Sequence, residues 1–70
     1  MTAVHVLRTV QAGGRVEVEL FSEPLSDRLV DHLHSAVASG SLQAFEVRAG
    51  YLNGGDTAVV HHGPARVAVE

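Results

Sequence analysis

The distribution of apolar and polar positions along the chain predicts strands at both ends and one helix between them. Alternation is strictest in residues 15–21, RVEVELF, where the charged side chains share one side and the valines and leucine share the other. A period of two is typical of a strand with one buried face. Residues 3–11 are rich in β-branched side chains and form the preceding strand, and Gly13–Gly14 supplies a two-residue hairpin turn.

Residues 22–40, SEPLSDRLVDHLHSAVASG, have the spacing of an amphipathic helix. The apolar side chains recur every three or four residues and form one stripe, which consists of Leu25, Leu29, Leu33, Ala36 and Val37. Ser22 is the predicted N-cap, and Pro24 is tolerated in a first turn. Gly40 supplies the left-handed residue with which many helices end.

Three further strands are predicted after the helix, at residues 42–52, 57–62 and 65–70. The NGGD sequence at 53–56 is a turn of the same kind as the first. A Gly-Pro corner at 63–64 separates the last two strands, because proline cannot donate to a strand ladder.

This order, β-β-α-β-β-β, predicts one small α+β domain over residues 1–70, with one helix packed on a mainly antiparallel sheet. A strongly curled, partly closed barrel, with the helix plugging one side, is the alternative. One helix about 10 Å across covers only two or three of five strands that lie about 4.8 Å apart. Apolar sheet surface is left uncovered, which favours a homodimer or another protein partner.

The turns also predict which side chains share a face. A two-residue turn at Gly13–Gly14 places Leu7 opposite Leu20, so that the apolar side of residues 15–21 faces the core. The reverse side of this hairpin then carries an exposed apolar patch that is a candidate partner or oligomer surface, and its members are Val4, Val6, Val10 and Phe21.

A two-residue turn at Gly54–Gly55 places Val47 opposite His62, on the core side of the second hairpin. His61 then lies on the outer side near Arg48 and Arg66, and this trio is a second candidate partner surface. Arginine side chains suit carboxylates and other anions, so the same trio is also a weak candidate for anion or nucleic-acid binding.

Composition narrows the class of protein. The chain has 70 residues, 46% hydrophobic residues, a net charge of −3 and no cysteine. Disulfides and thiolate metal sites are therefore excluded, and a domain this small usually needs a partner for stability. All the basic residues are arginine, which indicates a GC-rich genome such as that of an actinobacterium or its phage.

Neither a membrane span nor a signal peptide is evident in the sequence, so a cytoplasmic location is predicted. The negative charge, the scattered arginines and the three aromatic residues make nucleic-acid binding an unfavoured function.

No residue pattern indicates catalysis. The glycines form neither a nucleophile elbow nor a phosphate-binding loop. The adjacent His61 and His62 point to opposite faces of a strand, so they do not bind one metal ion together. No catalytic residue, metal or cofactor is therefore assigned.

The leading function is a non-enzymatic interaction, regulatory or accessory protein that self-associates through sheet surface or edges. The alternative is a small-molecule-binding domain or small enzyme with a pocket between helix and sheet. His5, Tyr51 and His62 would then be the polar groups of that pocket.

Overall fold

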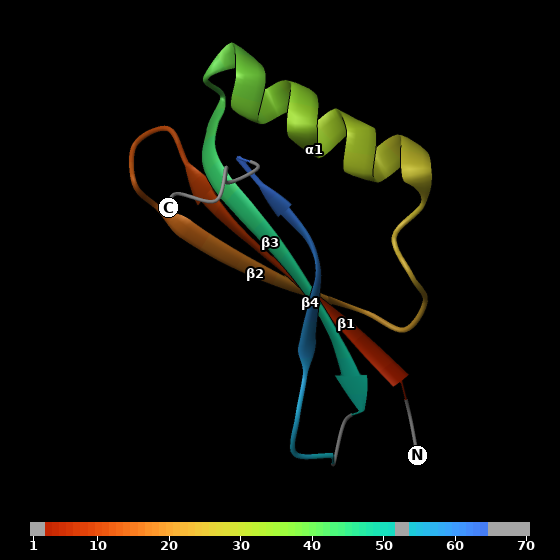
Figure 1. The fold of residues 1–70 in the computed structure, drawn as a ribbon. Helices are drawn as coiled ribbons and strands as arrows, with labels where there is room; N and C mark the ends of the chain where they lie inside the picture. Colours follow the sequence, from red (N-terminus) through yellow and green to blue (C-terminus); the bar gives the residue numbers. More distant parts are fainter. Residues whose placement is uncertain (1–2, 52–53, 65–70) are drawn as a thin grey trace, which may run out of the picture.

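One helix lies on one side of a four-stranded antiparallel sheet in the computed structural model, which describes residues 3–51 and 54–64 (Figure 1). The elements are β1 (Ala3–Gln11), β2 (Val16–Phe21), α1 (Asp27–Ser39), β3 (Leu42–Tyr51) and β4 (Ala58–Gly63). The predicted α+β domain is thus confirmed, and the four strands do not close into the alternative barrel. The predicted strand at 65–70 lies outside the described residues.

The strands lie in the order β2-β1-β3-β4, so β1 and β3 are the two central strands and β2 is an edge strand. α1 connects β2 to β3 and brings β3 to the free side of β1, where the two pair antiparallel. α1 packs over β3 and β4, and it leaves the helix side of β2 uncovered.

The helix begins later than the sequence predicts. Its N-cap is Ser26, whose side chain accepts a hydrogen bond from the backbone N–H of Leu29 at 3.2 Å. Ser22 is not the cap, because Pro24 disfavours helical backbone at the residue before it. The predicted end is confirmed: Gly40 has φ +89°, and Ser41 N–H donates to the carbonyl of Ala36 at 2.9 Å.

The core lies between α1 and the two central strands. Its fully packed side chains are Leu7, Leu33, Phe45 and Val47, with partly buried residues around them. Val47 is 1% exposed, and the ring of His34 meets that of Phe45 edge-on with centroids 5.0 Å apart. The alternate residues of each strand point to the opposite side of the sheet, away from α1.

The first hairpin has a three-residue loop, not the predicted two-residue turn. Gln11 and Arg15 close the loop, with Gln11 N–H donating to the Arg15 carbonyl at 2.7 Å and Gly14 N–H donating to the Gln11 carbonyl at 2.8 Å. Gly14 has φ +94°, as expected for the left-handed position that ends such a loop. The extra loop residue shifts the register by one and places Leu7 opposite Glu19.

The predicted register of the second hairpin is also wrong. β3 ends at Tyr51 and β4 begins at Ala58, so the connection is longer than two residues. A bulge at Val60 then shifts the pairing within β4, since Val47 pairs with His61 while Arg48 pairs with Val59.

Gly63 is the closest approach between β4 and the core. It pairs with Phe45, and a Cβ atom at this position would lie within van der Waals overlap of the Phe45 ring. Glycine is required here because the phenyl ring covers the backbone.

Within the described residues, no helix is long and apolar enough to cross a membrane.

The N-cap analysis predicts that Ser26→Ala lowers the free energy of unfolding by about 1 kcal/mol, because the Leu29 N–H loses its acceptor. Ser22→Ala is the matched control and should leave stability unchanged. Urea unfolding followed by circular dichroism measures both variants, and equal losses would show that Ser26 does not cap the helix.

The close approach at Gly63 predicts that Gly63→Ala destabilises the protein by about 1–3 kcal/mol, since the added methyl group forces the Phe45 ring to move. Gly55→Ala is the control, because a Cβ there meets no atom within 4 Å. Thermal unfolding compares the two, and an unchanged melting temperature for Gly63→Ala would contradict this packing.

Candidate functional site

The side of the sheet that faces away from α1 is apolar over much of its area, and we call it the open face. Its apolar members are Val4, Val6 and Val10 on β1, Val16, Val18 and Leu20 on β2, Ala44 on β3 and Val59 on β4. Val18 and Leu20 are 60% and 63% exposed, although each side chain is fully apolar. The most exposed apolar side chains of the open face therefore lie on its β2 edge.

Polar side chains form one compact group within the open face. The strand registers place Val18, Arg8, Glu46 and His62 side by side in one row that crosses all four strands. The next row consists of Leu20, Val6, Arg48 and Val59. The polar side chains therefore lie on β1, β3 and β4, while the open face of β2 is entirely apolar.

The charges of this group are partly paired within the chain. Arg48 Nε lies 3.1 Å from Glu46 Oε1, and a second guanidinium nitrogen donates to Thr57 Oγ1 at 3.3 Å. Arg8 is exposed and makes no ion pair with any other residue that the structure describes. Glu46 is the cross-strand neighbour of Arg8, so a carboxylate lies beside this cation without a direct contact.

The open face is uneven in shape as well as apolar. A hollow of about 540 Å³ lies over β3 and β4, and its lining includes Arg8, Ala44, Glu46, Val59, His62 and Pro64. β2, at the other edge, carries the exposed Val18 and Leu20. One edge of the open face therefore carries its most exposed apolar side chains, and the other is hollowed.

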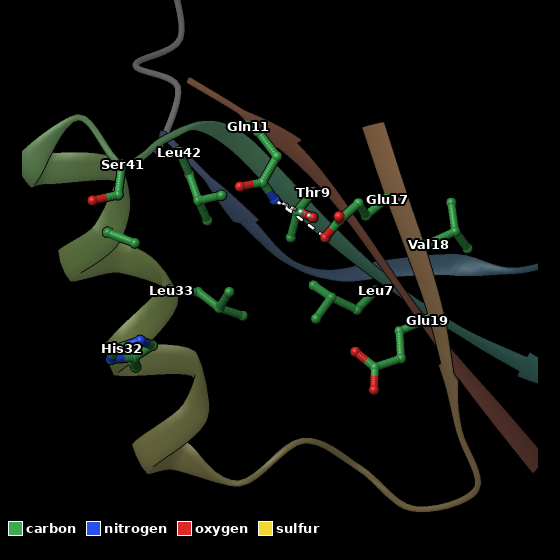
Figure 2. Close-up of a pocket in the computed structure, with 11 residues that line it drawn as sticks. Leu7, Thr9, Gln11, Glu17, Val18, Glu19, His32, Leu33, Ser41 and Leu42 are labelled. Carbon is green, nitrogen blue, oxygen red and sulfur yellow. Dashed lines mark hydrogen bonds between the residues drawn. The ribbon is translucent and has the colours of Figure 1, made fainter. Parts of the chain in front are cut away.

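A groove of about 620 Å³ lies on the opposite side of the sheet, between α1 and the uncovered helix side of β1 and β2. Figure 2 shows Leu7 and Leu33 facing each other across it, with Glu17 and Glu19 on the β2 wall and His32 on the helix wall. Leu7 and Leu33 are already 7% and 6% exposed, so a bound ligand would remove little further apolar surface from water.

The polar groups of the groove are largely paired with one another. The Gln11 amide donates to Thr9 Oγ1 at 3.3 Å and to Glu17 Oε1 at 3.4 Å, as the dashed lines of Figure 2 indicate. Glu17 also lies 2.8 Å from a guanidinium nitrogen of Arg15. These contacts fit a solvated sheet surface at the edge of the core.

The adjacent His61 and His62 each lie on the side of the sheet opposite to the predicted one. The prediction that His61 and His62 lie on opposite sides of the sheet is confirmed, but their sides are reversed by the β4 bulge: His61 pairs with Val47 on the helix side, and His62 pairs with Glu46 on the open face. Arg48 therefore neighbours His62 and not His61, and Arg66 lies outside the described residues.

The polar groups predicted for a helix–sheet pocket are also apart. His5 pairs with Ala49 on the helix side, and Tyr51 is 52% exposed at the far end of β3. His62 lies on the other face, and none of the three lines the groove. Among the residues that the structure describes, no three histidine, aspartate or glutamate side chains come close enough to hold a metal ion.

The predicted apolar patch is partly correct. Val4, Val6 and Val10 lie on the open face, but Phe21 lies on the helix side, where it packs against the core beside His5. The apolar side of β2 was predicted to face the core and forms the most exposed part of the open face instead. The signal for this was the second glycine of the loop, since a left-handed residue at the end of a three-residue loop shifts the register.

Comparisons of the chain with family models, with curated proteins and with solved structures found no match.

Proposed function

We propose that this protein is a non-enzymatic interaction protein, and that it self-associates through the open face of its sheet. The observation that carries the proposal is the exposure of Val16, Val18 and Leu20, three apolar side chains in a row on a regular strand. A strand with its charged residues toward the groove and its apolar residues toward solvent gains stability only when that apolar side is covered.

The small size of the core favours a permanent partner, one that is bound whenever the chain is folded. Five apolar side chains are buried among the described residues, and the chain has no disulfide. A domain of this size buries only about 60% of the surface of its unfolded chain, so oligomerisation is a common source of additional stability. A second copy of the same chain is always available for this purpose.

The edge of β2 is less suited to self-association than the open face. Antiparallel pairing of β2 with its own copy keeps like faces together when the register is centred on a residue, and five residues of each copy pair only in the registers centred on Val18 and Glu19. Each of these registers places a glutamate opposite a glutamate of the other copy, which is destabilising. Of the two modes of self-association that the sequence predicts, through sheet surface or through edges, the sheet surface is therefore favoured.

A small-molecule-binding role in the groove between α1 and β2 has weaker support. The leucines at its base are already buried, and Glu17 has partners in Arg15 and Gln11. The cytoplasmic location remains a prediction from the sequence.

The proposal predicts that the wild-type chain sediments as a dimer at micromolar concentration and that Leu20→Ser weakens it. Each copy loses the burial of one leucine, which amounts to about 2–4 kcal/mol for the symmetric pair and a roughly 30- to 900-fold rise in Kd. Sedimentation velocity over a concentration series measures this Kd.

Tyr51→Ser is the matched control, because Tyr51 is similarly exposed but lies on the helix side of the sheet. Its dimer should be as strong as the wild-type dimer. A wild-type chain that stays monomeric at several hundred micromolar, or equal effects of the two substitutions, would overturn the proposal.

A further inference from the structure

The open face carries enough pattern to define how two copies fit together, and this inference rests on the proposed self-association. We propose that the copies pack sheet against sheet about a two-fold axis parallel to the strands and midway between β1 and β3. Arg8 of each copy then faces the partner's Glu46. The axis places β1 over the partner's β3 and β2 over the partner's β4.

The area that a stable dimer needs favours this central axis. The strands average about eight residues, so four of them at about 4.8 Å spacing give one sheet face a footprint of about 500 Å². A typical stable interface buries about 800 Å² of accessible surface per partner, and the accessible surface of corrugated side chains exceeds their footprint. Full overlap of the two sheets reaches this range, whereas an axis over the β2–β1 half would bury about half as much.

The shape of the open face points to the same axis. The most exposed apolar side chains, Val18 and Leu20, are on β2, and the hollow lies over β3 and β4. An axis parallel to the strands places the exposed side chains of β2 of one copy over the hollow of the other. A two-fold axis perpendicular to the strands would instead set β2 on β2 and hollow on hollow.

The charges separate the two axes further. With the axis parallel to the strands, rows face equal rows, so Arg8 lies over the partner's Glu46 and Leu20 lies over the partner's Val59. With the perpendicular axis β1 would face the partner's β1, which has no acidic side chain on the open face, so Arg8 would lose water without gaining a counter-charge. Burying an unpaired guanidinium is costly, so the parallel axis is favoured.

Arg48 does not oppose this arrangement. It lies over the partner's Val6, but it already pairs with Glu46 of its own chain at 3.1 Å and bonds to Thr57. Each copy then contributes two arginines and one glutamate to the charged group, and Glu46 lies between Arg48 of its own chain and the partner's Arg8. Charges placed in this way set the orientation of a dimer more than its affinity.

The test exchanges the two charges in separate chains. In a dimer of Arg8→Glu chains, the new carboxylate of each copy lies over the partner's Glu46, so both contacts join two negative charges. In a dimer of Glu46→Arg chains, both contacts join two positive charges. Each variant alone should lose at least about 100-fold in dimer affinity. Mixed in equal amounts, the two variants should form a one-to-one heterodimer with affinity within about tenfold of wild type, because both contacts then join opposite charges.

Sedimentation velocity measures the affinities, and native mass spectrometry identifies the heterodimer by the unequal masses of the two variants. Glu19→Arg is the control, because it makes the same change of charge on the helix side of the sheet and should dimerise as the wild type does. Circular dichroism establishes that each variant is folded.

Different results would overturn the proposed function and the proposed arrangement. A wild-type chain that does not dimerise overturns the proposed function. A wild-type dimer that depends on Leu20, together with variants that dimerise alone or do not recover on mixing, overturns this arrangement and leaves the proposed function in place.

A second measurement applies if either charge variant is unfolded. The chain has no cysteine, so Leu20→Cys mixed with Val59→Cys offers one thiol per chain. A bismaleimide that spans about 10 Å, the separation of packed sheets, should link these two chains efficiently. Leu20→Cys mixed with Tyr51→Cys is the control, and equal linking in both mixtures would overturn the arrangement.

Discussion

The three-residue loop of the first hairpin determines which surfaces of this protein face water. Because side chains alternate along a strand, one residue more or less in the loop exchanges the two sides of β2. With Gly14 in the left-handed position, the glutamates of β2 face the groove beside α1, and its valines and leucine face away from the helix. The exposure of the apolar side of β2 and the glutamates on the β2 wall of the groove both follow from this register.

The core and the open face centre on different strands of the same sheet. α1 covers β3 and β4 on one side, so the buried core centres on Phe45 and Val47. The apolar surface on the other side centres on β1 and β2, where no helix lies. A sheet with apolar residues on both faces and a cover on one is an incomplete sandwich, which the proposed second copy would complete.

The charged group within the open face gives that surface a direction. A wholly apolar sheet face would accept another sheet at many angles and offsets. In the proposed dimer, Arg8, without an ion pair among the described residues, and Glu46, its neighbour across the strands, favour one arrangement of the two copies over the others. Orientation, more than binding strength, is what such a group contributes at an interface.

The sequence by itself determined the order of elements, the amphipathic helix, its glycine end and the opposite orientation of His61 and His62. Those features depend on local propensity and on alternation, which short stretches of sequence carry. The face of β2 that meets the core, the position of Phe21 and the sides of the two histidines were decided only in the tertiary structure. Each depends on a loop length or a bulge, at Gly14 and Val60, that shifts pairing by one residue. Such a shift costs little locally, and short stretches of sequence do not specify it.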